Sequence, residues 1–422
     1  MGIGWFSVFK HQRESVAKYN AYLTNAENFE KKEIYYDALS NYKAAFEMDN
    51  QNYQIIMKIA DIHFKLGDYN SYLNDCKTAS SINPHNPDPY LKEANYYISK
   101  SDYSSAIKIL NKAIENCDDE QINVMKKDLS TKCIEKYVSF QDVGDWNFQL
   151  QYSYITYAVG EKWGLAFKDG RKIVKNQFDY MGAYDAQTGF IPCSNDGVYF
   201  YIDANGNKRL VGDHDYTYLG MFSEGLATAQ LNGKYGYIDT KFNEYHFEYE
   251  YAGTFRNNIA AVKQSGKWAL VNKEFKNITG FIYDDILMDK NGICSQYNVM
   301  VVRQGSEYRF VDRDGKIIGN GSFESANIAV SNNGYIAVKK NGKWGFADIS
   351  SNMVIEPQYE SAKSFSLGLA PVKENDKWYY IDVETKAVTE AEYDDAGVFS
   401  PDGSAPVKKG TSWNFLILCE YA

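Results

Sequence analysis

At 422 residues, the chain is long enough for two or three domains with cores of their own. Its 45 basic and 55 acidic residues give a formal net charge of −10 without a basic block, which argues against nucleic acid as a partner. Six cysteines without paired spacing, and no apolar run near the roughly 18 residues of a membrane span, predict a cytoplasmic protein without stable membrane insertion.

The first part of the chain repeats itself. Tyr35, Tyr69 and Tyr103 are each 34 residues apart and occupy the same position of three aligned segments. A period of this length is typical of stacked helix pairs. We expect three such pairs between about residues 19 and 120, and a polar-faced capping helix at about 121–137.

These segments resemble the tetratricopeptide repeat, with the small residues Ala26, Ala60 and Ala94 where the two helices of a pair pack closely. The resemblance implies that the first helix of each pair lines a concave groove that binds a peptide or a partner helix. Carried over to this sequence, the groove positions are Leu23, Glu27, Met57, Asp61, Phe64, Leu91, Asn95 and Ile98. Apolar and acidic side chains predict a protein ligand with hydrophobic anchors and a few basic residues. The alternative is that Met57 and Leu91 are core residues.

The remainder of the chain has a different repeat, in which an aromatic anchor returns every 33 to 40 residues. The anchors are Trp163, Tyr199, Tyr235, Trp268, Tyr308, Trp344, Trp378 and Trp413. Turn-forming pairs such as Asn341-Gly342 precede the anchors, and short segments of alternating polarity flank each pair. Each unit therefore predicts a small antiparallel sheet of three or four short strands, with the anchor mostly buried against the neighbouring unit.

The segments FSEGLATAQLNGKYGYID (222–239) and LGLAPVKENDKWYYID (367–382) resemble the WG-containing repeats of bacterial proteins. The resemblance covers about residues 150 to 422, and it implies interaction with other molecules rather than catalysis.

The two ends of this repeat region predict how it closes. The last copy, 404–418, stops after two strands, and a strand-like stretch at 145–153 precedes the first full copy. A closed ring would use that stretch to complete the truncated unit, which would remove a sheet edge prone to aggregation. We therefore expect an α+β multidomain protein: a helical repeat domain at 1–138, and at 139–422 a propeller-like ring of seven full units and one composite unit. An open β-solenoid is the alternative.

The histidines and acids do not predict a metal site. The stretch GDHDY gathers Asp213, His214 and Asp215 in one loop, and His246 and Glu248 share one strand face. Neither group has the spacing of a metal site, so no metal and no cofactor is expected.

Two carboxylate pairs, at 284–285 and 394–395, invite a reading as acid–base machinery. Both follow the closing aromatic residue of a repeat unit, which favours a turn-capping role. No nucleophile elbow, phosphate loop or paired cysteine and histidine is present, so we predict that the protein is not an enzyme.

The sequence thus predicts a non-catalytic scaffold for protein partners, with a second docking surface on the β domain. The longest unit contains an extra loop at 287–298, which is either a binding loop or a tolerated insertion. The alternative function is a glycan-binding or hydrolytic protein that uses the mouth of the β domain. Acids and aromatic residues outside the repeat consensus that converge at one mouth would favour this alternative.

Overall fold

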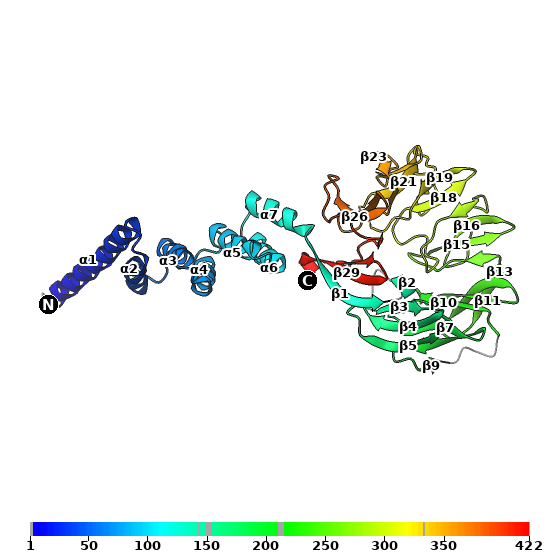
Figure 1. Cartoon of the computed structure of the whole chain (residues 1–422), viewed down its shortest axis with the longest axis horizontal. Coiled ribbons are helices and arrows are strands. Elements are labelled where there is room, and N and C mark those ends of the chain that lie inside the picture. The colour runs from blue at the N-terminus through cyan, green and yellow to red at the C-terminus, as the bar shows by residue number, and fades with distance from the viewer. Residues whose placement is uncertain (1–2, 142, 149–153, 210–214, 332–333, 422) are drawn as a thin grey trace. The chain divides into compact units, whose positions relative to one another are not determined.

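A computed structural model describes residues 3–141, 143–148, 154–209, 215–331 and 334–421. The chain forms two compact units: one contains the residues up to Lys132 together with the end of the chain from Cys419, and the other spans Cys133–Leu418 (Figure 1).

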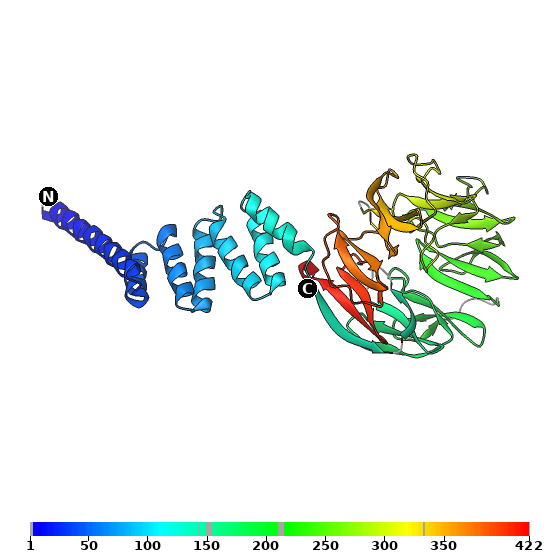
Figure 2. The same cartoon turned by 45° about the horizontal axis from the view of Figure 1, so that its top comes forward.

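The helical unit consists of three helix pairs and a seventh helix (Figure 2). The helices are α1 (Ile3–Lys31), α2 (Tyr35–Met48), α3 (Tyr53–Lys65), α4 (Tyr69–Ile82), α5 (Asp88–Ser99), α6 (Tyr103–Ile114) and α7 (Glu120–Ser130). Asn52, Asp68, Asp102 and Asp119 cap α3, α4, α6 and α7, because each side chain accepts a hydrogen bond from a backbone amide three residues on. The small residues at 26, 60 and 94 are fully buried, as close packing within each pair requires.

The helical unit ends earlier than expected. We expected the capping helix to reach 137 and the domain to end at 138, but α7 ends at Ser130 and Cys133–Gln141 forms strand β1. This strand pairs with the C-terminal strand β29 (Ser412–Leu418), starting with Cys133 opposite Leu418. Pairing with a distant strand therefore overrides the local preference for helix.

The β unit contains eight sheets of three or four antiparallel strands within the described residues. We number them as blades in chain order. Blades 1 to 4 are β2 (Val143–Phe148), β3 (Tyr154–Val159), β4 (Lys162–Phe167), β5 (Lys172–Phe178); β6 (Tyr180–Met181), β7 (Phe190–Asn195), β8 (Val198–Asp203), β9 (Lys208–Arg209); β10 (Tyr218–Ser223), β11 (Leu226–Leu231), β12 (Lys234–Asp239), β13 (Glu244–Tyr249); and β14 (Tyr251–Ala252), β15 (Ile259–Gln264), β16 (Lys267–Asn272).

Blades 5 to 8 follow the same plan. They are β17 (Asp285–Ile286), β18 (Met300–Gln304), β19 (Glu307–Val311); β20 (Ser325–Ala326), β21 (Ile336–Lys340), β22 (Lys343–Ala347), β23 (Met353–Tyr359); β24 (Ser361–Ala362), β25 (Leu369–Glu374), β26 (Lys377–Asp382); and β27 (Asp395–Ala396), β28 (Ser404–Lys409), β29, β1. The short helix η1 (Cys419–Tyr421) follows β29.

The β unit is an eight-bladed propeller, as expected, with seven full blades and one composite blade. The closing strand is a different one, however: β1 completes blade 8 beside β29 (Figure 1). The stretch at 145–153 was expected in that place, but its first part belongs to β2 and pairs with β3 in blade 1. Residues 149–153 lie outside the described residues.

Tyrosine hydroxyls join neighbouring blades. Tyr237 of blade 3 donates to the backbone oxygen of Gly253 in blade 4 at 2.9 Å, and Tyr380 of blade 7 donates to Gly397 of blade 8 at 2.6 Å. A side chain at Gly253 would place its Cβ 2.6 Å from the oxygen of Gly292, so the glycine is required there. Half-buried strand faces and these inter-blade bonds explain the use of 36 tyrosines.

The anchors are less buried than expected. Trp378 and Trp413 are each 8% exposed, whereas the other six anchors are half-buried. The glycine after an anchor has a steric cause: a Cβ at Gly345 would lie 2.4 Å from the backbone oxygen of Ile355, where the fourth strand bulges past β22.

Candidate functional site

The eight predicted groove residues lie on the first helix of each pair. Leu23 and Glu27 belong to α1, three residues belong to α3, and three belong to α5. We call the surface that α1, α3 and α5 form with these positions the first-helix face.

The eight residues differ in how much surface they offer. Met57 and Leu91 are each 8% exposed and belong to two hydrophobic cores. Phe64 is 48% exposed, and Glu27 and Asn95 are exposed as well. The half-buried residues are Leu23, Asp61 and Ile98. A ligand on this face would therefore find its largest apolar contact at Phe64.

Ion pairs between successive first helices neutralise part of the acidity. Lys58 Nζ lies 3.2 Å from Glu30 of α1, and Lys92 Nζ lies 2.5 Å from Asp61 of α3. Burial pushes the pKa of Glu30 upward, but hydrogen bonds from Tyr42 and Lys58 outweigh it and hold the pKa below its usual value. Sequence reasoning missed the two lysines, although they are 34 residues apart and follow Met57 and Leu91 directly.

Phe64 belongs to an aromatic cluster on the helical unit. Its ring lies 5.6 Å from that of Tyr69 and 5.0 Å from that of Tyr72, and Tyr96 of α5 lies 5.2 Å from Tyr69. Lys100 Nζ lies above the Tyr69 ring at 5.2 Å. Sequence reasoning assigned Tyr69 only a structural role, because it recurs with the repeat.

The carboxylate pairs of the β unit divide into a turn cap and a second acid. Asp284 accepts from the amide of Gly305 at 2.7 Å, and Asp394 accepts from that of Gly410 at 2.6 Å. Each also binds the lysine that precedes an anchor, with Lys267 donating to Asp284 at 2.6 Å. These lysine hydrogen bonds, followed by the amide bonds, lower the pKa of both carboxyls. The turn-capping role is confirmed.

The expected absence of a metal site is consistent with what the structure describes. Within the described residues, no three histidine, cysteine or acidic side chains gather as metal ligands. His246 Nδ1 lies 3.4 Å from Glu248 as a single pair, while Asp213 and His214 lie outside the described residues. Among the described helices, none is long and apolar enough to cross a membrane.

The extra loop at 287–298 packs on the neighbouring blade 4. Thr254 donates its amide to Gly292 at 2.8 Å, and Asn257 donates its side-chain amide to the oxygens of Ser295 and Gln296 at 2.8 and 2.9 Å. Lys290 forms an ion pair with Asp145 of blade 1. The loop therefore has a structural role in joining blades 1, 4 and 5.

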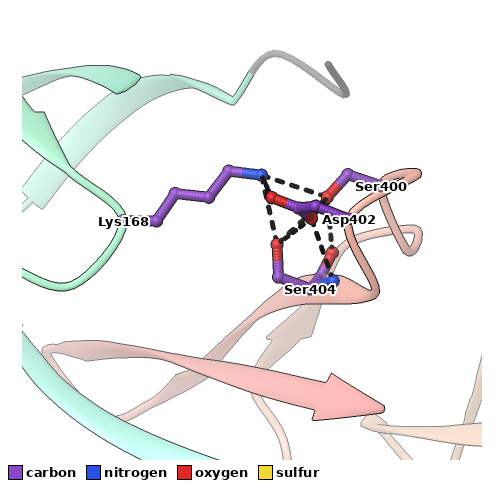
Figure 3. A network of polar contacts seen from close by, with 4 residues as sticks. All are labelled: Lys168, Ser400, Asp402 and Ser404. Carbon is purple, nitrogen blue, oxygen red and sulfur yellow. Dashed lines mark hydrogen bonds and ion pairs between the residues drawn. The ribbon is translucent and has the colours of Figure 1, made fainter. Parts of the chain in front are cut away.

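A buried lysine joins the first and last blades (Figure 3). Lys168, which follows β4, lies 2.6 Å from Asp402 in the turn between β27 and β28, and 3.1 Å from the hydroxyls of Ser400 and Ser404. Burial lowers the pKa of Lys168, and Asp402 counters this effect. A serine beside a lysine suggests nucleophilic catalysis, but Asp402 accepts from both hydroxyls and holds the ammonium as an ion pair. We call this network the ring latch.

The ring latch follows a pattern. Lys273 and Arg313, like Lys168, stand five residues after an anchor. Lys273 donates to the backbone oxygen of Glu224 at 2.7 Å, and Arg313 donates to that of Asn257 at 2.5 Å, in each case on the preceding blade. Of these three contacts, only the one between the first and last blades uses a carboxylate.

An open cavity of about 480 Å³ lies between the outer strands of blades 1 and 2. Phe178, Phe200 and Ile202 supply apolar lining, and Asp196 and Lys208 supply charged lining. Lys208 Nζ lies 4.2 Å from the centre of the Phe200 ring. The cavity has the size and mixed lining of a site for one apolar side chain of a partner.

Comparisons with known proteins support the repeat assignment. The family model described as WG containing repeat matches residues 199–235, 235–268, 308–344, 344–378 and 380–413. No curated protein matches the sequence.

Solved structures give weak matches to each unit. A structure described as the eukaryotic initiation factor is 11% identical, with 67% of this chain and 86% of that chain covered and a TM-score of 0.45. The first TPR of Spaghetti bound to an HSP90 peptide is 16% identical, with 26% of this chain and 90% of that chain covered and a TM-score of 0.23. The TPR2B domain of yeast Sti1 in complex with an Hsp70 peptide is 17% identical, with 27% and 87% covered and a TM-score of 0.22. At these scores, the fold rests on the helix pairs and on the strand pairing described above.

The matched segments run from one anchor to the next, and each spans the end of one blade and the start of another. The propeller is therefore built from WG-containing repeats, and it is joined to an array of tetratricopeptide-like helix pairs.

Proposed function

We propose that the protein is a non-catalytic scaffold that binds a peptide or a partner helix on its first-helix face. The observation that carries the proposal is Phe64, a large apolar side chain that is 48% exposed and lies on α3, between the exposed Glu27 of α1 and Asn95 of α5. An exposed aromatic residue of this size, beside polar residues, is typical of an interaction surface.

The ligand should carry hydrophobic anchors and a few basic residues. Phe64, Leu23 and Ile98 provide apolar contact, whereas Met57 and Leu91 stabilise the helical core beneath them. Because Glu30 and Asp61 already bind lysines of the same face, selection for a basic residue rests mainly on Glu27, which acts on the association rate.

The propeller provides the second docking surface of this proposal. The cavity between blades 1 and 2 combines the apolar lining of Phe178 and Phe200 with charges at its edge. The placement of the 287–298 loop against blades 1 and 4 makes this loop a less suitable binding element.

A peptide-display selection on the full chain tests the proposal, followed by calorimetry with the selected peptides. Selected ligands should pair hydrophobic residues with lysine or arginine. Phe64→Ser should weaken binding by about tenfold or more, and Glu27→Lys should slow association.

Tyr36→Ser provides a matched control, since Tyr36 is 76% exposed on the second helix α2. This control should bind as the wild type does. Selected peptides that bind Phe64→Ser and Glu27→Lys unchanged, but fail to bind Phe200→Ser, would place the site on the propeller. Selection of no peptide on either surface would refute the scaffold function.

A further inference from the structure

One position of the first strands distinguishes three neighbouring blades from the other five. Strand pairing connects each anchor through one residue of the second strand to one residue of the first strand; Trp268, for example, pairs with Lys263, and Lys263 pairs with Tyr251. The first strand lies nearer the middle of the ring than the last strand, as β2 and β5 show (Figure 1). The eight first-strand residues, which we call the inner row, are Asp145, Tyr180, Tyr218, Tyr251, Asp285, Ser325, Ser361 and Asp395.

The tyrosines of the inner row are not needed by the fold. Five blades form the same strand pairing with aspartate or serine at this position, whereas the consecutive blades 2, 3 and 4 carry Tyr180, Tyr218 and Tyr251. A feature that most blades lack, and that three neighbours share, is better explained by a ligand than by the architecture.

These tyrosines form a continuous surface with the anchors of the same blades. The ring centres of Tyr180 and Tyr218 are 6.0 Å apart, and the series continues through Tyr235 and Tyr251 to Trp268 with separations of 5.9, 5.2 and 5.4 Å. The anchor of blade 2, at position 199, lies 6.0 Å from Tyr218. We call these six residues the aromatic belt.

The aromatic belt meets solvent within a crowded part of the ring. All six side chains are half-buried rather than buried. Burial nevertheless raises the pKa of Tyr180 well above its ordinary value and that of Tyr251 to about 12. Rings that keep solvent contact while protein surrounds their hydroxyls suit a ligand that inserts beside them, rather than one that lies on a flat surface.

Blades 2 and 3 also leave their anchors open on the second strand. In blades 4, 5 and 8, a lysine or arginine of the second strand lies over the anchor ring, as Lys263 does over Trp268 at 5.7 Å. The equivalent residues of blades 2 and 3 are Ser194 and Gln230, which carry no charge and leave room for a ligand to stack.

The charges around the inner row favour an uncharged ligand. Every inner-row side chain carries an oxygen atom, and none is cationic. Two of the three aspartates are matched, Asp145 by Lys290 and Asp395 by Lys363 at 3.0 Å. Asp285 follows Tyr251 on the next blade, and its side chain makes no ion pair with any of the described residues. One acceptor carboxylate beside three tyrosine hydroxyls does not neutralise a polyanion or a polycation, but it does fit a ligand rich in hydroxyl groups.

We propose that the aromatic belt and Asp285 form a binding site for a neutral oligosaccharide. The apolar C–H faces of the sugar rings stack on the tyrosines of blades 2 to 4, sugar hydroxyls donate to Asp285, and tyrosine hydroxyls bond the remaining sugar oxygens. The site is independent of the first-helix face, so the scaffold function and this site stand or fall separately.

Calorimetry on the full chain tests the proposal, with cellohexaose, xylohexaose, maltohexaose and chitohexaose as probes. At least one probe should bind, and Tyr218→Ser with Tyr251→Ser should weaken that probe by about tenfold or more, since a stacked ring contributes on the order of one factor of ten. These substitutions introduce the residue that blades 6 and 7 use at the same position, so the strand pairing should persist.

A second pair of variants keeps the test decisive if the serine variants fail to fold. Tyr218→Phe keeps the ring and removes one hydroxyl, and Asp285→Asn keeps the size and removes the charge; each should weaken the probe several-fold with an unchanged melting temperature. Tyr36→Ser on the helical unit is the control and should bind normally. Binding of no probe by the wild type, or equal binding by all variants, would overturn the proposal. So would saturable binding of a decaproline peptide at the belt without any sugar binding, because it would assign these tyrosines to peptide recognition.

Discussion

The ring latch predicts a measurable contribution to closure of the propeller. Lys168 is only 12% exposed, whereas its partner Asp402 is 45% exposed, so the pair is solvated on one side. Breaking a fully buried pair from one side destabilises a protein by about 3–5 kcal/mol, and an exposed pair contributes about 0–1 kcal/mol. With one partner buried and the other exposed, we expect Asp402→Ala to lower the free energy of unfolding by about 2 kcal/mol.

The asymmetry of the pair gives the sharper test. Asp402→Ala leaves a buried ammonium without its counter-charge and removes an acceptor from Ser400 and Ser404. Lys168→Met removes the buried charge and keeps much of its apolar stem, so it should destabilise less, by about 1 kcal/mol. The double variant should resemble Lys168→Met, because the uncompensated charge is then absent. Urea unfolding followed by tryptophan fluorescence measures all three. Asp402→Ala within about 0.5 kcal/mol of the wild type would show that the latch is an ordinary surface ion pair.

Three further changes should have distinct outcomes. Glu93→Gln on α5 should raise the melting temperature at pH 7.5 and have little effect near pH 4: Glu93 is 3% exposed, one of its oxygens has no hydrogen-bond partner, and burial raises its pKa, so the folded state loses stability as the pH rises through and above the ordinary glutamate range. An equal effect at both pH values would contradict this assignment. Trp378→Ala should destabilise by about 3–5 kcal/mol and Trp344→Ala by roughly half as much, because only Trp378 is nearly buried; equal values by urea unfolding would show that exposure does not set the role of the anchors. Gly345→Ala should destabilise by more than about 1 kcal/mol through its clash with Ile355, whereas Gly266→Ala, with open space at its Cβ but a φ of 76°, should show only the smaller backbone penalty.

The repeat period predicted most of the fold, since a repeated pattern samples the same local physics many times. The helix pairs begin close to Tyr35, Tyr69 and Tyr103, and all eight anchors lie on the predicted strands. The closing strand was mispredicted because it occurs once. Nothing within Cys133–Gln141 identifies its partner, which lies about 280 residues away in the chain, and the local sequence reads equally well as the end of a helix.

Side-chain partners across the repeats were harder to predict than the elements. The pairing of Asp61 with Lys92 depends on which faces of two successive helices meet. The burial of Met57 and Leu91 depends on how closely those helices pack. A repeat alignment places a residue on a helix face but does not say whether the neighbouring helix covers it, and Phe64 is exposed where Met57, on the same helix, is not.

The carboxylate pairs show how a repeat separates architecture from function. The first acid of each pair, Asp284 or Asp394, caps a turn, and Asp179, Glu250, Glu324 and Glu360 make the same kind of bond in other blades. An acid in this place is therefore a requirement of the blade. The second acid, Asp285 or Asp395, lies in the inner row, where other blades carry serine or tyrosine. Two adjacent, chemically identical side chains thus differ in kind, because the blade fixes one position and leaves the other free to vary. Residues at the free position are the ones that a ligand can select, which is why the aromatic belt lies in the inner row and not among the anchors alone.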